Sequence, residues 1–199
     1  ICDLKSEIIK AYGENPQESE DYPRIVNSKN LVRLTNMLQD SEVVFGGTFD
    51  TEDCYLAPTL IDEPSLDSEV MKAEIFGPIL PILSYETEKD IHSVLSKYDK
   101  PLGFYVFSNN TSFYKKMIET YSFGGGTIND TMIHFGNPNL PFGGVGESGI
   151  GAYHGRLGFD TFSHKKGIVI KGNWLDIPLR YAPYTNKLNA LKKLFKFFG

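Results

Sequence analysis

The feature that most constrains the fold is an alternation of strand-like and helix-like segments between residues 43 and 129. Runs of β-branched and aromatic residues favour strands, and apolar residues repeated every three or four positions favour amphipathic helices. Predicted strands lie at residues 43–45, 55–61, 79–85 and 104–107 and from 127, and predicted helices cover 87–98 and include 114–121. This order predicts an α/β fold with a mostly parallel sheet.

Two more helices are predicted before the first strand. The first covers Leu4 to Tyr12 at helical spacing and ends at Gly13, a residue that favours helix ends. The second begins at Asn27 or Ser28, either of which can cap a helix. Three leucines form the apolar face of this second helix: Leu31, Leu34 and Leu38.

Prolines and one capping pattern refine these boundaries. Pro58 lies inside the strand predicted at 55–61, so that strand is either at a sheet edge or broken. Pro81 is the weak point of the strand predicted at 79–85. Thr87 and Asp90 have the spacing of a capping box, which predicts the helix start there.

Composition excludes several classes of protein. The net charge of −5 argues against nucleic acid as the main partner. Cys2 and Cys54 have no zinc-type spacing, and no histidine pair has that of a metal site, so we expect no metal. We expect reduced thiols in a cytoplasmic protein, with a disulfide as the alternative. No apolar stretch approaches the ~18 residues that a membrane-spanning helix requires.

A glycine pattern at Gly144–Gly149 matches the GxGxxG fingerprint of dinucleotide-binding proteins but lacks its context. The fingerprint follows a strand and opens a helix, whereas residues 137–141 contain two prolines and two asparagines. We therefore interpret residues 136–158 as a long loop. Loops of this length in compact domains are usually functional.

The segment Glu74-Ile75-Phe76-Gly77-Pro78 places a carboxylate and an aromatic ring two residues apart. If the segment is extended, Glu74 and Phe76 share one face. A carboxylate can accept two hydrogen bonds from a ribose diol, and a ring beside it can contact a nicotinamide. The alternative is a surface glutamate and a core phenylalanine before a proline turn.

This segment and the stretch Leu140-Pro-Phe-Gly-Gly-Val-Gly-Glu-Ser-Gly-Ile-Gly151 together resemble the C-terminal half of an NAD(P)-dependent aldehyde dehydrogenase. The residues that follow, 152–155 and 159–164, resemble the class 3, or fatty aldehyde dehydrogenase-like, branch. The resemblance implies an α/β catalytic-domain sheet with flanking helices and a C-terminal oligomerisation arm. It implies aldehyde oxidation to a carboxylic acid, with an aldehyde substrate and NAD or NADP as cofactor.

The resemblance also assigns roles to particular residues. Glu74 matches the glutamate that binds the nicotinamide ribose, and Phe76 matches the phenylalanine beside the nicotinamide. Asn129 is expected to bond neighbouring backbone, and His134 to line the substrate channel or to be a hydrogen-bonded structural histidine. Two residues of the glycine-rich stretch are assigned to the channel or to active-site support: Phe142 and Gly143.

The family's nucleophilic cysteine and general-base glutamate match positions upstream of Ile1, as does most of the dinucleotide-binding part. We therefore expect a fragment with no catalytic residue of its own, inactive alone. The alternatives are a stand-alone, non-catalytic binding or assembly module with the same half-fold, and an acylating dehydrogenase on this scaffold.

The resemblance divides the chain into three regions: residues 1–158 as part of the catalytic domain, 159–172 as an oligomerisation strand, and 173–199 as a tail. Residues 159–171 are expected to pair across a homodimer. Within this tail, residues 180–199 carry five cations and no acidic residue, and four apolar residues share one predicted helical face: Leu188, Leu191, Phe195 and Phe198. A basic amphipathic helix at 187–198 predicts weak contact with a membrane surface, or packing on the enzyme itself or a partner subunit.

Overall fold

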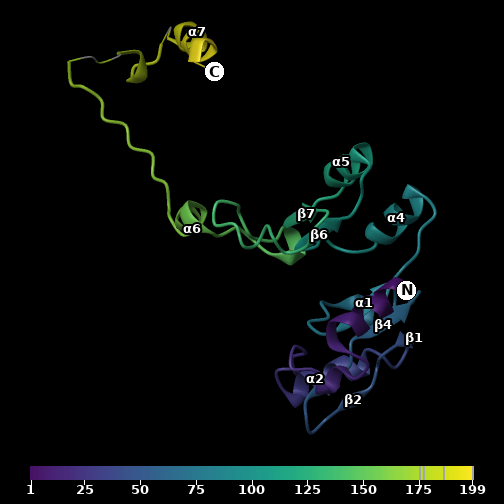
Figure 1. The fold of residues 1–199 in the computed structure, drawn as a ribbon. Coiled ribbons are helices and arrows are strands. Elements are labelled where there is room, and N and C mark those ends of the chain that lie inside the picture. The colour runs from purple at the N-terminus through teal and green to yellow at the C-terminus, as the bar shows by residue number, and fades with distance from the viewer. Residues whose placement is uncertain (175, 177, 186, 199) are drawn as a thin grey trace.

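The computed structural model describes residues 1–174, 176, 178–185 and 187–198, arranged as two lobes followed by an arm (Figure 1). The N-terminal lobe contains α1 (Cys2–Tyr12), η1 (Pro16–Glu18), α2 (Ser28–Asn36), β1 (Val43–Phe45), β2 (Phe49–Asp50), β3 (Tyr55–Leu56), β4 (Thr59–Asp62), α3 (Glu69–Lys72) and β5 (Ile79–Ile82). The second lobe contains α4 (Glu88–Leu95), β6 (Gly103–Val106), α5 (Thr111–Thr120) and β7 (Gly125–Ile128). The remaining elements are η2 (Gly146–Ser148), α6 (Gly155–Thr161), η3 (Pro178–Arg180) and α7 (Leu188–Phe198).

The predicted α/β class is confirmed, but the strands of the described chain form three small sheets. In the sheet β1–β4–β5, β4 pairs antiparallel with β1 and parallel with β5. The pair β2–β3 is antiparallel and the pair β6–β7 is parallel. The prediction of a mostly parallel sheet was therefore wrong. Parallel pairing needs a crossover, which α3 and α5 provide, whereas the β2–β3 hairpin returns the chain from β1 to β4 antiparallel.

The core of the N-terminal lobe forms where α2 packs on the sheet. The side chain of Asn27 accepts a hydrogen bond from the Asn30 amide at 2.9 Å, so Asn27 is the cap of α2. Leu31 and Leu34 are 1% and 0% exposed, as their predicted helical face requires. The apolar side chains buried with them are Met37, Leu56, Ile61, Val70 and Ile79.

Two other boundary predictions are confirmed. The strand predicted at 55–61 is divided by Pro58 into β3 and β4. Thr87 and Asp90 form the capping box of α4, with the Asp90 carboxylate accepting from the Thr87 amide at 2.8 Å. Hydrogen bonds from the amide and the hydroxyl of Thr87 and from the Glu86 amide hold the pKa of the Asp90 carboxyl below its usual value.

The segment predicted as a loop followed by a strand differs from the structure. Helix α6 occupies Gly155–Thr161, so residues 159–161 are helical and not extended. An ion pair between Arg156 and Asp160, one helical turn apart, fits this helix. Within the described chain, residues 162–172 pair with no strand. The arm that begins at residue 162 carries the single tryptophan of the chain, Trp174, at 86% exposure.

Among the described residues, no helix combines the length and the apolar character needed to cross a bilayer. The two cysteines are free thiols, so the structure contains the reduced form that the sequence favoured over a disulfide. The Cys54 sulfur lies 3.6 Å from the Ser28 hydroxyl at the start of α2.

Two glycines with left-handed backbone provide a matched pair of variants. Gly46 has φ +72°, and a Cβ atom there would lie 2.0 Å from the Pro58 carbonyl oxygen, whereas Gly13, with φ +81°, has open space around it. Both Gly→Ala changes carry the conformational penalty, but only Gly46→Ala adds a steric clash. We expect Gly46→Ala to lower the free energy of unfolding by roughly 1–3 kcal/mol more than Gly13→Ala. Urea unfolding of both variants measures the difference, and equal losses would contradict this account.

Candidate functional site

Glu74 and Phe76 lie in one groove of about 620 Å³ on the N-terminal lobe. The residues that line it come from the segment before α2, from α2 itself and from the segment after α3: Arg24, Ile25, Val26, Asn30, Arg33, Ala73, Glu74 and Phe76. The groove therefore combines two guanidinium groups, one carboxylate and an aromatic ring. Such a mixture can bind a ligand that has both polar and flat apolar parts.

The backbone reaches this arrangement by a turn and not by an extended strand. Phe76 has φ +47°, in the left-handed region that non-glycine residues rarely adopt. The argument that residues two apart share a face of an extended chain was therefore wrong, although both side chains still line one groove. Phe76 is 78% exposed, which also contradicts the alternative of a core phenylalanine.

Helix α2 holds the segment that carries Glu74 and Phe76. The Arg33 guanidinium donates a hydrogen bond of 2.6 Å to the Ile75 carbonyl, between the two candidate residues. A Cβ atom at Gly77 would lie 2.5 Å from the Leu34 side chain, so the backbone packs directly on the core. Sequence reasoning missed Arg33, because no local pattern links a residue of α2 to a carbonyl 42 positions away.

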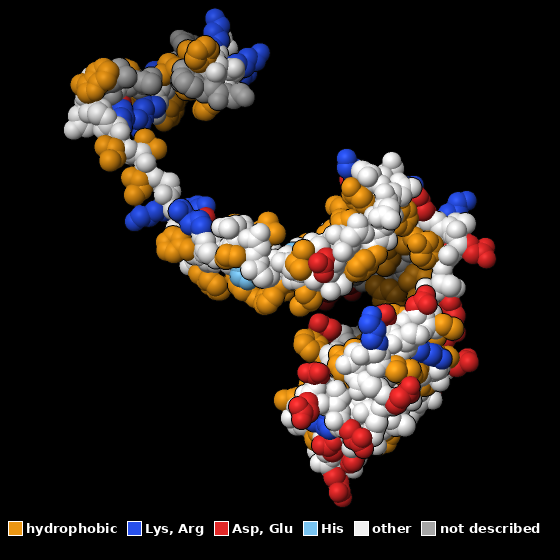
Figure 2. Space-filling view, in the orientation of Figure 1, with side chains coloured by type: hydrophobic (Ala, Val, Ile, Leu, Met, Phe, Trp, Pro, Cys, Tyr) orange, Lys and Arg blue, Asp and Glu red, His pale blue; other side chains and the backbone are white. Residues whose placement is uncertain are grey.

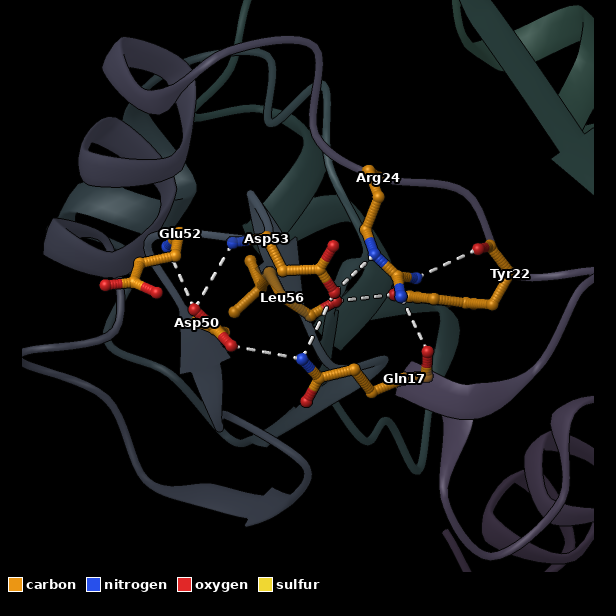
Figure 3. A network of polar contacts seen from close by, with 7 residues as sticks. All are labelled: Gln17, Tyr22, Arg24, Asp50, Glu52, Asp53 and Leu56. Carbon is orange, nitrogen blue, oxygen red and sulfur yellow. Dashed lines mark hydrogen bonds and ion pairs between the residues drawn. The ribbon is translucent and has the colours of Figure 1, made fainter.

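A polar network fixes Arg24 at the edge of the same groove (Figure 3). Its guanidinium donates to the Asp53 carboxylate at 2.8 Å and to the carbonyls of Gln17 and Tyr22 at 2.6 and 3.2 Å. The Gln17 side chain in turn donates to Asp50 and Asp53 at 3.2 and 3.1 Å. These bonds join the loop after α1 to the β2–β3 hairpin, so the groove wall is held before any ligand arrives.

Two titratable groups of this network are perturbed. Hydrogen bonds from the amides of Asp53 and Glu52 hold the pKa of Asp50 below its usual value. Burial raises the pKa of Tyr22, whose hydroxyl donates to the Leu56 carbonyl at 2.7 Å. The Asp50 carboxylate is thus an anionic acceptor and the Tyr22 hydroxyl a neutral donor, which matches the direction of their side-chain hydrogen bonds.

The glycine-rich stretch reaches Glu74 through a second groove, also of about 620 Å³. Its lining combines residues from three distant parts of the chain: Lys72 and Glu74, Lys100 to Gly103, and Glu147 with Ser148. The two motifs singled out in the sequence therefore meet along one surface. Gly143 is confined by backbone, since a Cβ atom there would lie 2.1 Å from the Gly151 carbonyl oxygen.

His134 and Phe142 belong to an aromatic cluster in the second lobe and the loop that follows it. Their ring centroids are 6.0 Å apart, and Phe142 also contacts Phe135, Tyr153 and His154 at 5.0, 5.6 and 6.0 Å. Phe142 and Tyr153 exchange backbone hydrogen bonds of 3.0 and 2.9 Å. The cluster closes the glycine-rich loop at its base, which is consistent with a supporting role for Phe142.

His134 is 8% exposed, and its Nδ1 lies 3.3 Å from the Thr127 hydroxyl. Its Nε2 is buried and has no hydrogen-bond partner among the described residues. This environment is that of a buried, hydrogen-bonded histidine, one of the two alternatives open from the sequence. The structure does not place it in either groove that contains Glu74.

Asn129 joins the ends of β6 and β7. Its Oδ1 accepts from the Ser108 amide at 2.7 Å, and its Nδ2 donates to the Ser108 carbonyl at 3.2 Å. Its φ of +59° is one that asparagine tolerates better than most residues. The prediction that Asn129 bonds neighbouring backbone is confirmed.

Among the described residues, no group of three or more His, Cys, Asp or Glu side chains is arranged to hold a metal ion.

Comparisons with known proteins give one consistent family. The family model described as the aldehyde dehydrogenase family matches residues 12–168. The 4,4'-diaponeurosporen-aldehyde dehydrogenase of Staphylococcus aureus is 44% identical over 198 residues, which cover 98% of this chain and 43% of that protein. The dimeric NADP-preferring aldehyde dehydrogenase of Rattus norvegicus is 43% identical over 187 residues, or 93% of this chain and 41% of that protein.

A solved structure, the substrate-bound state of Staphylococcus aureus AldH, superposes with a TM-score of 0.86 at 44% identity. The superposed region covers 98% of this chain and 43% of the chain in that structure. The chain thus spans well under half the length of these relatives, and the match includes both lobes and the glycine-rich stretch.

The bond between Arg33 and Ile75 can be tested by substitution. Arg33→Gln removes the charged donor, and we expect the free energy of unfolding to fall by about 1.5 kcal/mol, the lower end for a charged donor because Arg33 is half-buried. Amide hydrogen exchange of residues 73–78 is expected to accelerate, since the segment loses its tether to α2.

Lys29→Gln is the matched control, because Lys29 is an exposed cation on the same helix. We expect it to leave both the unfolding free energy and the exchange of 73–78 unchanged. Equal exchange in Arg33→Gln and Lys29→Gln would show that Arg33 does not hold the segment.

Proposed function

Because the chain belongs to the aldehyde dehydrogenase family, we propose that it is the C-terminal part of a class 3-like enzyme that oxidises an aldehyde to a carboxylic acid with NAD or NADP. The observation that carries the proposal is the groove in which Glu74 and Phe76 lie together, held by Arg33. The relatives named as aldehyde dehydrogenases at 43–44% identity support the same reaction.

We assign to this chain the binding of the cofactor's nicotinamide end. The exposed Glu74 carboxylate can accept hydrogen bonds from both hydroxyls of a ribose, and the exposed Phe76 ring can contact a flat heterocycle. NAD(P)+, when bound, supplies the hydride acceptor. Fixing the ribose orients the acceptor ring toward the substrate, so that the reacting atoms meet in one geometry.

We assign a supporting role to the four residues of the second lobe and the glycine-rich loop: Asn129, His134, Phe142 and Gly143. Asn129 fixes the ends of β6 and β7, and the aromatic cluster around Phe142 fixes the base of the loop. The nucleophilic cysteine and the general base are expected from a part of the enzyme outside this chain. Cys2 and Cys54 have no nucleophilic role in this proposal.

We also propose that the enzyme is a cytoplasmic homodimer that pairs through residues 162–171, the part of the predicted 159–171 segment that lies beyond α6. Ile168, Val169 and Ile170 are 69%, 92% and 94% exposed, and their backbone pairs with no strand of the described chain. An apolar segment with unpaired backbone groups suits addition to the sheet of a second subunit. The rat relative is named as dimeric, which supports this arrangement.

The first test is the activity of the chain itself. We expect the 199-residue chain to form no NADH or NADPH from long-chain aldehydes, because covalent catalysis needs an activated cysteine and a base. The complete enzyme, assayed in parallel, is the positive control. Steady turnover by the chain alone would contradict the assignment, and loss of that turnover in Cys2→Ser or Cys54→Ser would identify the thiol involved.

The second test addresses Glu74 in the complete enzyme. Glu74→Gln weakens the charged hydrogen bonds to the ribose, and we expect hydride transfer to slow by roughly 10- to 100-fold. Single-turnover kinetics with an aldehyde deuterated at its carbonyl carbon isolate that step. Glu119→Gln, at an exposed position on α5, makes the same change of charge and is expected to be neutral. An unchanged rate in Glu74→Gln with a full isotope effect would exclude the cofactor role.

A further inference from the structure

We propose that the groove between α4 and α5 binds a long-chain carboxylate, with its alkyl chain in the groove and its head group beside Lys100. This inference does not depend on the reaction proposed for the enzyme. The groove encloses about 490 Å³, a volume within the usual range of small-molecule sites. Figure 2 shows hydrophobic side chains gathered between α5 and α4 in the second lobe.

The groove is lined mainly by apolar and aromatic side chains from the end of α4, from β6 and from the end of α5. These side chains are Leu95, Tyr98, Pro101, Phe104 and Tyr121. No residue of α4 is fully buried in the described structure, so the apolar side of this helix is still open to a partner. Each methylene that leaves water for such a lining tightens the binding of an alkyl chain by a factor of about 4.

The aromatic walls of the groove are held by contacts with the rest of the protein. The Tyr98 hydroxyl donates a hydrogen bond of 3.2 Å to the Leu66 carbonyl in the N-terminal lobe. The ring centroid of Tyr121 lies 6.0 Å from that of Phe104, and its hydroxyl lies 3.5 Å from His92 Nδ1 on α4. Because these side chains are already fixed, little conformational freedom is lost when a ligand binds.

Lys100 supplies a cation beside this apolar lining. It is exposed and, among the described residues, forms no ion pair. Its stem lies beside the glycine-rich loop, since a Cβ atom at Gly146 would be 3.7 Å from Lys100 Cδ. A lysine stem can cover apolar surface while its ammonium stays in water, where it can pair with an anion. Lys100 and Pro101 also line the groove that contains Glu74, so the head group lies next to the candidate cofactor site.

Asp99 restricts the charge of the head group. Its exposed carboxylate also lines the groove, next to Lys100 in the chain. Asp99 repels a dianion, such as a phosphate monoester, about twice as strongly as it repels a monoanion. The long, flexible lysine stem lets the ammonium move onto the head group, whereas the shorter Asp99 side chain has less reach. Together these two residues favour a head group with a single negative charge, which is the charge of a carboxylate.

The experiment is isothermal titration calorimetry of the 199-residue chain with decanoate, octanoate and decan-1-ol, each below the concentration at which it aggregates. We expect decanoate to bind roughly 10-fold more tightly than octanoate, because the groove buries two more methylenes. Lys100→Gln is expected to weaken decanoate binding roughly 3- to 5-fold and to leave decan-1-ol binding unchanged. Asp99→Asn is expected to strengthen decanoate binding roughly 2-fold. Lys97→Gln removes an exposed lysine outside the groove and is expected to have no effect.

A second pair of variants tests the groove itself. Ser122 is exposed and lines the groove, so Ser122→Trp places a large ring where the alkyl chain would lie. We expect decanoate binding to fall by roughly 10-fold or more, because the ring displaces several methylenes. Ser112→Trp makes the same change at an exposed position near the start of α5, outside the groove, and is expected to bind decanoate normally.

Helix α7 is a second exposed apolar surface that could take up an alkyl chain. Leu188 and Phe195 on this helix are 62% and 72% exposed. The side chain of Phe198, which was expected on the same face, lies outside the described residues. Phe195→Ser is therefore a further control, and we expect it to leave decanoate binding unchanged.

Circular dichroism of all variants checks that the fold is retained, and the complete enzyme is titrated in parallel. We expect the complete enzyme to bind decanoate with the same dependence on Lys100. Absent binding, equal binding in Lys100→Gln and Lys97→Gln, or undiminished binding in Ser122→Trp would overturn the proposal. Loss of binding in Phe195→Ser would overturn it by placing the ligand on α7. Binding by the chain but not by the complete enzyme would overturn it too, and would assign the groove to a contact with another part of that enzyme.

Discussion

The contact between α2 and the segment after α3 is the interaction on which the candidate site depends. Leu34 is fully buried, and the backbone at Gly77 packs directly against it. One residue earlier on the helix, Arg33 holds the Ile75 carbonyl. The same helix therefore fills the core of the N-terminal lobe and fixes the turn that presents Glu74 and Phe76. Packing and binding geometry cannot be varied independently at this position, because adjacent residues of one helix serve both.

Local chemistry made much of the fold predictable. The break at Pro58, the capping box at Thr87 and the buried leucines of α2 follow from side chains that act on their own neighbourhood. What was missed depends on partners far along the chain. Nothing near Arg33 indicates its bond to Ile75, and nothing near Phe76 indicates its left-handed backbone. The antiparallel pairings were missed for the same reason, since the direction of strand pairing depends on the connection between the two strands.

For the candidate site, residues of the two quoted motifs line one surface, but the motifs did not indicate how that surface is built. Glu74 and the glycine-rich stretch do line a common groove, although they are about seventy positions apart in sequence. Of the residues predicted to support the active site, Asn129 makes the expected backbone hydrogen bonds, whereas His134 and Phe142 lie in a separate aromatic cluster. Residue type and motif spacing can identify such a cluster's members. Residue type and spacing do not show which cavity a side chain faces, because that depends on how the helices and strands between the two motifs pack.

The exposed tryptophan has an optical consequence. Trp174 is the single indole of the chain, and it lies in the arm between α6 and η3 at 86% exposure. Excitation of tryptophan alone therefore monitors the arm, and events inside the two lobes leave the emission largely untouched. A shift of that emission to shorter wavelength would mean that the arm has moved out of water, and the signal requires no added label.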